Sequence, residues 1–213
     1  MTTEAVIPVG GEDAIRADIA GEPRLGGVVF AHGSGSSRHS PRNRHVAEVL
    51  QEAGLQTVLL DLLTEGEEQR DIQTGEHRFD IDLLTERLLA AVSWLQDNGF
   101  DHPLGLFGAS TGAAAALRAA AAAPESIGAV VSRGGRPDMA GDALGDVRAP
   151  TLLIVGGKDE LVLELNKRAL AALNDESSLE VVKGASHLFE EPGALDRVAE
   201  LASTWFRDRL TTG

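Results

Sequence analysis

The amino-acid sequence predicts an α/β fold, with a mostly parallel, doubly wound sheet and helices on both of its faces. Short apolar runs bounded by Gly, Pro or Asp alternate with segments of helical periodicity, which is the order typical of β-α-β units. Runs such as 28–30 and 152–155 are apolar at every position, as in strands that helices cover on both sides. The chain has 213 residues, and we expect a single domain over residues 1–213.

Two N-terminal segments and six later apolar runs are the predicted strands. Residues 6–9 and 14–19, separated by Gly10 and Gly11, are expected to form an antiparallel hairpin at one edge of the sheet. Since crossovers between parallel strands are right-handed, the later runs should build a sheet with helices on both faces. These six strands are expected at residues 25–31, 57–62, 104–107, 127–132, 151–155 and 179–183.

Helices are predicted between these strands. Asp80 can cap a helix whose apolar residues form one stripe, and Gly99 can end it. Residues 111–123 are nearly all alanine, which favours a helix that packs closely on a sheet. The polar and charged stretch 64–79 shows no such pattern, and we expect a long irregular loop that can close over one side of a site. Three more helices are expected at residues 41–53, 161–173 and 195–206.

The composition disfavours several kinds of partner. The formal net charge is −14 without any basic cluster, so we expect no nucleic-acid partner and no membrane partner. The chain has no cysteine, which excludes disulfides, a thiol nucleophile and thiolate metal sites. Its first residues do not resemble a signal peptide, and no apolar stretch approaches the roughly 18 residues of a membrane span. We therefore expect a cytoplasmic protein.

Residues 108–112, Gly-Ala-Ser-Thr-Gly, fit the pattern G-x-S-x-G and make Ser110 the candidate nucleophile. The pattern follows a predicted strand and opens a predicted helix, a context in which a sharp turn lifts the serine hydroxyl above the sheet. Small residues at Gly108 and Gly112 let the neighbouring backbone pass without a clash. The structural alternative is a glycine-rich turn whose serine only caps the helix.

Asp159 and His187 are the candidate catalytic partners of Ser110. Each follows a predicted strand, so both should lie at the carboxyl edge of the parallel sheet, where Ser110 also emerges. There His187 can take the proton of Ser110 as a general base, and Asp159 can fix the tautomer of the imidazole and stabilise its cation. Asp138 follows another strand and is the alternative acid. Taken singly, Asp159 can be an ordinary loop carboxylate and His187 a surface or capping histidine.

Residues 32–36, His-Gly-Ser-Gly-Ser, follow a predicted strand and form the candidate oxyanion loop. The backbone N–H groups of Ser34 and of Thr111, the residue after the nucleophile, are the two expected donors to the developing oxyanion. We expect a structural role for His32, because its side chain should point toward the base of the loop. A phosphate-binding turn is the alternative for this stretch, which lacks the lysine and the spacing of a P-loop.

Arg133 lies at the same predicted edge of the sheet, after the strand at 127–132. It can bind an anionic group of a substrate, or it can pair with the loop acids Glu65, Glu67 or Glu68. Residues 133–150 contain several Gly and Pro residues, so we expect no helical cap of useful length there. The site should then be shallow and suited to short or polar acyl groups.

The chain resembles the dienelactone hydrolase-like branch of the α/β-hydrolases. The resemblance spans nearly the whole chain and implies the α/β-hydrolase fold without a large cap domain, with esterase-type activity. Ser110, Asp159 and His187 follow one another along the chain in the order that is expected for the catalytic residues of that fold. True dienelactone hydrolases use a cysteine nucleophile, whereas this chain has Ser110, which argues for ordinary esters as substrates. The matching residues are 32–36, 108–112, 157–159 and 186–187.

A second resemblance concerns a bacterial subgroup of hydrolases whose members are sometimes fused to phosphoribosyltransferase domains. The segments that carry it are residues 62–64 and 132–137. This resemblance implies hydrolysis of an ester but specifies no substrate.

These observations predict a carboxylic-ester hydrolase that forms an acyl-enzyme on Ser110 and needs neither a metal nor an organic cofactor. The expected partner is a small-molecule ester, and a homodimer remains open. An acyltransferase or a thioesterase on the same triad is the alternative enzyme, which the preferred acceptor of the acyl group would distinguish. The alternative outside enzymes is a ligand-binding or scaffolding domain that has kept the fold. Labelling by a fluorophosphonate probe separates it from a hydrolase, because only an activated serine reacts.

Overall fold

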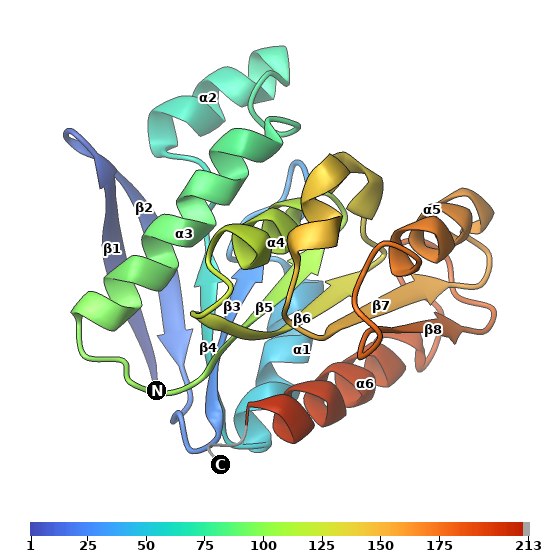
Figure 1. Cartoon of the computed structure of the whole chain (residues 1–213). Coiled ribbons are helices and arrows are strands. Elements are labelled where there is room, and N and C mark those ends of the chain that lie inside the picture. Colours follow the sequence, from blue (N-terminus) through green and yellow to red (C-terminus); the bar gives the residue numbers. More distant parts are fainter. Residues whose placement is uncertain (211–213) are drawn as a thin grey trace.

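The computed structural model describes residues 1–210, which form one eight-stranded sheet with helices on both faces (Figure 1). The spatial order of the strands is β1-β2-β4-β3-β5-β6-β7-β8. The first two strands run antiparallel to their neighbours, and all later pairs are parallel. The strands are β1 (Thr2–Gly10), β2 (Asp13–Ala20), β3 (Gly26–Ala31), β4 (Leu55–Leu60), β5 (Leu104–Ala109), β6 (Ile127–Arg133), β7 (Thr151–Gly156) and β8 (Ser178–Val182).

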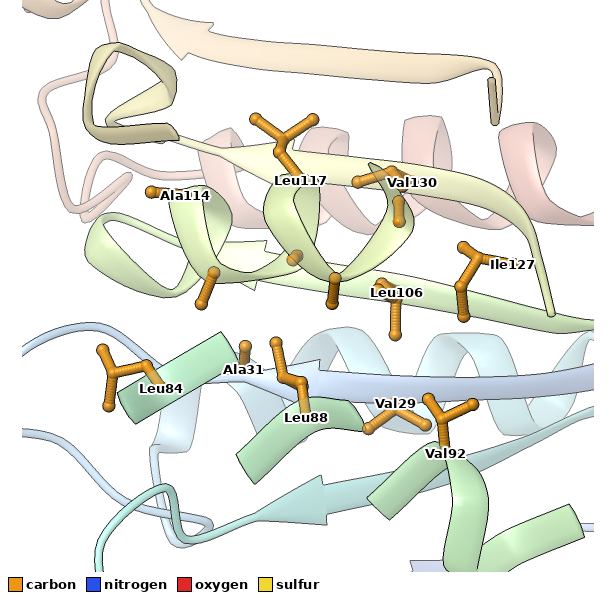
Figure 2. Packing of buried hydrophobic residues seen from close by; sticks show 14 of the residues in the cluster. Val29, Ala31, Leu84, Leu88, Val92, Leu106, Ala114, Leu117, Ile127 and Val130 are labelled. Carbon is orange, nitrogen blue, oxygen red and sulfur yellow. The ribbon is translucent and has the colours of Figure 1, made fainter. Parts of the chain in front are cut away.

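Helices cover the sheet from both sides. On one face, α1 and α6 pack through a cluster of apolar residues that includes Leu50 and Phe206. On the other face, α3, α4 and α5 pack through a cluster in which the alanines of α4 approach the sheet closely and Leu88 of α3 fills the space beside them (Figures 1 and 2). The helices are α1 (Pro41–Glu52), α2 (Glu65–Thr74), α3 (Ile81–Asp97), α4 (Thr111–Ala122), α5 (Glu160–Leu170) and α6 (Ala194–Arg209).

The chain reverses its direction of winding between β3 and β5. From β3 the chain crosses to β4 on one side, and from β4 it returns to β5 on the other side of β3. The loops that leave the carboxyl ends of β3 and β5 therefore diverge, which opens a crevice at this edge of the sheet. The predicted doubly wound, mostly parallel sheet with an antiparallel edge hairpin is confirmed.

The stretch 64–79 is not the irregular loop that the sequence predicts, because residues Glu65–Thr74 form α2. A capping box starts this helix: Thr64 Oγ1 accepts a hydrogen bond from the Glu67 N–H, and the Glu67 carboxylate accepts one from the Thr64 N–H. The helix has almost no apolar stripe, and its only buried residue is Asp71. Polar interactions therefore order this segment, and a search for hydrophobic periodicity cannot find it.

Strand β4 begins and ends two residues earlier than predicted. Leu55 pairs with Gly26 of β3 and starts the strand. After Leu60 the chain leaves the sheet, because the Leu62 N–H donates to the imidazole of His32 and not to a neighbouring strand. This departure directs the following residues toward α2.

The segment between β6 and β7 carries no helical cap. Residues Pro137–Asp146 form a short 3₁₀ segment, η1, with a kink at Gly141 where φ is 60°. The segment packs mainly against α4 and α5. Within residues 1–210 we find no cap domain, and none of the helices there has the length and the apolar character needed to cross a membrane.

Candidate active site

Ser110 occupies a sharp turn between β5 and α4. Its φ of 51° and ψ of −119° lie in a region that residues with a side chain rarely adopt, and the surrounding backbone holds it there. A Cβ at Gly108 would lie 2.6 Å from the carbonyl oxygen of Gly112, and a Cβ at Gly112 would lie 2.5 Å from that of His32. Both positions therefore require glycine: at Gly108 the strand passes close to the start of α4, and at Gly112 the turn passes close to the backbone that leaves β3.

The loop after β6 fixes this turn from the other side. The Ser110 N–H donates to the carbonyl oxygen of Arg133 at 3.2 Å, and the Arg136 N–H donates to the Ser110 carbonyl oxygen at 3.1 Å. The side chain of Ser110 makes no capping hydrogen bond to α4, so a serine that only caps the helix does not describe the turn. The hydroxyl stays available at the carboxyl edge of the sheet.

The structure brings Asp159 and His187 together. The distance between Asp159 Oδ2 and His187 Nδ1 is 2.6 Å, so Nδ1–H donates to the carboxylate and Nε2 is left free. Gly156 makes this approach possible, because a Cβ there would lie 2.5 Å from the carbonyl oxygens of Ala185 and Ser186 in the loop that carries His187. Asp159 is mostly buried and His187 is about 38% exposed.

Ser110 and His187 share a cavity of about 220 Å³, which we call the nucleophile cavity. Ser110 Oγ and His187 Nε2, which both belong to the described part of the chain, form no hydrogen bond with each other. Such contacts are often long without substrate and tighten in the complex. The lining residues are Gly33, Ser34, Ser36, Ser40, Arg42, Asn43, Ala109, Ser110, Arg133, His187 and Leu188.

Asp138, the alternative acid, lies elsewhere. Its carboxylate accepts two hydrogen bonds from the guanidinium of Arg136, at 2.8 and 2.7 Å. These hydrogen bonds, more than the opposing desolvation, hold the pKa of Asp138 below its ordinary value. Asp138 is thus already paired, and Asp159 is the carboxylate on His187.

Two backbone N–H groups close to the nucleophile have no acceptor within residues 1–210. Thr111 is the first residue of α4, so its N–H has no acceptor within the helix. The N–H of Ser34 donates to no acceptor among residues 1–210. Ser34 and Thr111 line one cavity, and Ser34 also lines the nucleophile cavity. Two unpaired donors at this place can stabilise a developing oxyanion.

His32 is part of the support under this loop. Its Nδ1–H donates to the Gly33 carbonyl oxygen at 2.9 Å, and its Nε2 accepts the Leu62 N–H at 3.2 Å. Burial lowers the pKa of His32, so the ring is neutral, as these two bonds require. The side chain therefore connects the loop after β3 with the loop after β4, in agreement with the structural role predicted for it.

Arg133 is buried in the wall of the nucleophile cavity, where only 8% of it is exposed. The pairing with Glu65, Glu67 or Glu68 does not occur: within residues 1–210 Arg133 forms no ion pair, and Glu65 pairs with Arg16 and Glu67 with Arg87. Desolvation and, second, the charge of Arg42 lower the pKa of Arg133 to about 10. The guanidinium is still charged at neutral pH.

Sequence reasoning missed two polar residues of this region. Arg42, in the first turn of α1, lines the nucleophile cavity, and its place after the candidate oxyanion loop is the only signal that could have singled it out. Glu191 accepts hydrogen bonds from the Ser186 N–H at 3.0 Å and lies 3.8 Å from Lys158 Nζ. These contacts connect the loops of His187 and Asp159, and hydrogen bonding by the Ser186 N–H lowers the pKa of Glu191. Nothing in the sequence near Glu191 indicates this role.

A second cavity, of about 230 Å³, shares Gly33, Ser34 and Ser36 of the oxyanion loop with the nucleophile cavity; we call it the α2 cavity. Its apolar lining comes from Leu62, Leu63, Ile72 and Leu84, and α2 supplies one wall. Ser34 and Thr111 border it, so an acyl group whose carbonyl oxygen faces these amides can extend into it. The segment 64–79 therefore covers one side of the site, as a helix.

Within residues 1–210 there is no cluster of three or more His, Cys, Asp or Glu side chains that could bind a metal ion. The chemistry that this arrangement can perform is acyl transfer, with a hydroxyl, a carboxylate-bound imidazole and two free amides around one crevice.

Residues 27–149 match the α/β-hydrolase fold family. A crystal structure of dienelactone hydrolase from Anabaena variabilis is 53% identical to this chain, with a TM-score of 0.94, and the match covers 99% of this chain and 98% of that one. Est1E from Butyrivibrio proteoclasticus has the same fold at 16% identity, with a TM-score of 0.81 and coverage of 96% and 98%.

Two Mycobacterium tuberculosis proteins are 60% identical to this chain over 191 residues, or 89% of its length. Each of them bears the name "Putative phosphoribosyl transferase". The chain spans only 42% of the length of each of these relatives. The similarity therefore concerns one part of a longer protein in both cases.

Proposed function

Because the chain belongs to the α/β-hydrolase family, in its dienelactone hydrolase-like branch, we propose that it is a serine hydrolase acting on carboxylic esters. Ser110 is the proposed nucleophile, His187 the general base and acid, and Asp159 the residue that orients the imidazole. The N–H groups of Ser34 and Thr111 are the proposed oxyanion donors. The single observation that supports this most is the 2.6 Å contact of Asp159 with His187 beside the turn of Ser110.

The proposed reaction has two halves. In the first, Ser110 Oγ adds to the ester carbonyl carbon as its proton moves to His187 Nε2, and the oxyanion accepts hydrogen bonds from the Ser34 and Thr111 N–H groups. The C–O bond to the alcohol then breaks, and His187 gives its proton to the departing oxygen. In the second half, water adds to the acyl-enzyme by the same proton transfers and releases the acid.

Active-site titration tests this proposal directly. With p-nitrophenyl acetate in excess, we expect a burst of about one p-nitrophenol per chain when deacylation limits turnover, and an acetyl group on Ser110 by peptide mass spectrometry. A fluorophosphonate probe should label the same residue. Absence of labelling at Ser110 under conditions in which the chain is folded would favour a non-catalytic domain.

The α2 cavity supports a preference for small acyl groups. At about 230 Å³ it has room for a short chain, and within residues 1–210 no cap domain extends it. We expect kcat/KM for p-nitrophenyl esters to peak at short acyl chains between acetate and palmitate. A steady rise toward palmitate would contradict this assignment.

An acyltransferase or a thioesterase on the same triad is the alternative reaction. The geometry of Ser110, His187 and Asp159 serves all three, since they differ only in the leaving group or acceptor. Comparing transfer of the acetyl group to water, to an alcohol and to a thiol separates them. The part of the curated relatives that this chain does not cover is outside this proposal.

A further inference from the structure

The nucleophile cavity contains two guanidinium groups that no carboxylate neutralises well. Nη1 of Arg133 and Nε of Arg42 are both buried and have no hydrogen-bond partner. Arg133 forms no ion pair among residues 1–210. Arg42 approaches one acid, Glu190, at 3.8 Å, and that carboxylate is largely exposed to solvent.

This arrangement is costly for the folded protein alone. Arg133 is a buried charge that lacks a partner and so loses its hydration without compensation, and Arg42, whose side chain is 35% exposed, adds a second positive charge beside it. Arg42 and Arg133 line the same cavity, and the charge of Arg42 is the second cause, after desolvation, of the lowered pKa of Arg133. A bound oxyanion would supply the missing acceptors, because guanidinium groups match the geometry of phosphate and carboxylate oxygens.

The charge balance favours phosphate over carboxylate. Arg42 and Arg133 together carry two positive charges in the cavity, and the exposed Glu190 offsets them only in part. A phosphate monoester carries a charge of about −1.5 to −2 at neutral pH and can compensate both, whereas a single carboxylate leaves one cation in excess. Arg42 lies in the first turn of α1, whose N-terminal dipole adds to the attraction for an anion.

The position of His187 decides which half of the ester carries this anion. His187 gives its proton to the departing alcohol oxygen, so the alcohol must leave on the side of His187. His187 and Arg133 line the same cavity, whereas neither lines the α2 cavity. The acyl group therefore fits the α2 cavity and the charged group belongs to the alcohol.

We propose that Arg42 and Arg133 form a phosphate subsite, and that the substrate is an ester of a short acyl acid with a phosphorylated alcohol. This rests on the proposed hydrolase function of Ser110 and specifies its substrate. The protein cleaves the carboxylic ester, and the phosphate monoester remains intact on the released alcohol.

Four butyrate-sized esters test the proposal. Phenyl butyrate carries no charge. In 3-butyryloxybenzoate the phenol carries a carboxylate, and in 3-butyryloxyphenyl phosphate it carries a phosphate. Monophenyl succinate instead carries a carboxylate on the acyl group. We expect kcat/KM to be about tenfold to hundredfold higher for the phosphate ester than for phenyl butyrate, with the carboxylate on the phenol in between. Preference for monophenyl succinate would overturn the assignment of the two cavities, and equal rates for carboxylate and phosphate would overturn the choice of phosphate.

Variants identify the residues. Arg133→Gln should lower the ratio of phosphate-ester to neutral-ester kcat/KM at least about tenfold, and Arg133→Lys should restore part of it. Arg42→Gln should lower the same ratio. Because Arg42 is more exposed than Arg133, this variant tests the subsite if Arg133→Gln does not fold. Arg148→Gln is the matched control, because Arg148 is exposed and pairs with Glu125 outside both cavities. An unchanged ratio in both cavity variants would overturn the proposal.

Binding of inorganic phosphate separates this inference from the hydrolase function. Calorimetry should detect phosphate binding in the wild type and in Ser110→Ala, and weaker binding by at least about tenfold in Arg133→Gln and Arg42→Gln. If phosphate binds in this way but none of the four esters is cleaved, the proposed function fails and the subsite stands. If the esters are cleaved without any phosphate effect, the subsite fails alone.

Discussion

The two walls of the site are stabilised by different interactions. Behind Ser110 the backbone is packed so closely that two glycines cannot carry a Cβ: Gly108 lies against the start of α4, and Gly112 lies against the backbone at the end of β3. Across the crevice, α2 has one buried residue, Asp71, and is connected to its surroundings by the ion pairs Asp71–Arg78 and Glu67–Arg87.

This difference separates two requirements of an enzyme. The reacting groups must be placed within fractions of an ångström, and close packing of backbone on backbone achieves that. The wall that contacts the variable part of a substrate can tolerate change, and α2 permits it because a few polar contacts hold the helix and almost no apolar core lies beneath it. We call the turn of Ser110 the first wall and α2 the second wall. Substitutions on the first wall should change kcat, and substitutions on the second wall should change the selectivity among substrates.

Ser110→Ala should have the largest effect on activity. If Ser110 is the nucleophile, kcat should fall by at least about a thousandfold with p-nitrophenyl acetate, because the triad acts as a unit. The melting temperature should change little, since alanine keeps the backbone of the turn and Ser110 makes no side-chain cap.

Ser93→Ala is the control for this variant, because Ser93 is exposed on α3 away from both cavities. It should keep wild-type kcat. Turnover by Ser110→Ala at the wild-type rate would contradict the proposed reaction.

Gly112→Ala tests the close contact itself. The new Cβ would lie 2.5 Å from the carbonyl oxygen of His32, in the backbone that leads to the oxyanion loop. We expect a loss of at least about 1–3 kcal/mol in the free energy of unfolding, from urea denaturation. We also expect kcat/KM to fall about a hundredfold, because the amide of Ser34 moves relative to Ser110. A variant as stable and active as the wild type would show that this wall is not rigid.

The first wall was largely predictable from the sequence and the second was not. Ser110, Asp159 and His187 each follow an apolar run, and parallel strands bring the ends of such runs to one edge. For α2, no apolar periodicity exists to be found, although Thr64 and Glu67 have the spacing of a capping box. For Arg42 the sequence offers only its place after the candidate oxyanion loop, because its position in the cavity depends on neighbours such as Arg133 and His187 that are distant in the sequence.

Asp71→Asn should loosen the second wall. The Asp71 carboxylate accepts hydrogen bonds from the His77 and Arg78 N–H groups and from Arg78 Nε, at 2.8 to 2.9 Å. Losing the charge should cost about 1–3 kcal/mol of local stability, so amide exchange in α2 should rise about tenfold or more. The ratio of kcat/KM for p-nitrophenyl butyrate to that for the acetate should change as well. Asp142→Asn, at an exposed position, is the control.

The same residue gives this wall a pH dependence. Burial would raise the pKa of Asp71, but the hydrogen bonds from Arg78 and His77 outweigh it and keep that pKa below its ordinary value. The stabilisation of α2 by Asp71 is therefore complete at a pH above the ordinary pKa of an aspartate. It is lost as the pH falls through the lower pKa that Asp71 has in the folded protein. The amide exchange rates of α2 should differ between the wild type and Asp71→Asn at neutral pH, and the two sets of rates should become equal in acid. A constant difference down to the acid limit would mean that another group holds the helix.

Gly66→Ala should have the smallest effect, and its sign opposes that of Gly112→Ala. Gly66 is the second residue of α2, and a Cβ there would meet no atom within 4 Å. Alanine restricts the unfolded chain and favours the helix, so α2 should be stabilised by at most about 0.4–1 kcal/mol. Because polar contacts join α2 to the rest of the molecule, this gain should appear as slower amide exchange within Glu65–Thr74, with little change in the global melting temperature. The same glycine-to-alanine change is thus expected to stabilise α2 and to destabilise the turn at Gly112, so the two variants compare how well each wall tolerates an added methyl group. A destabilising effect at Gly66 similar to that at Gly112 would refute the distinction between a closely packed wall and an adjustable one.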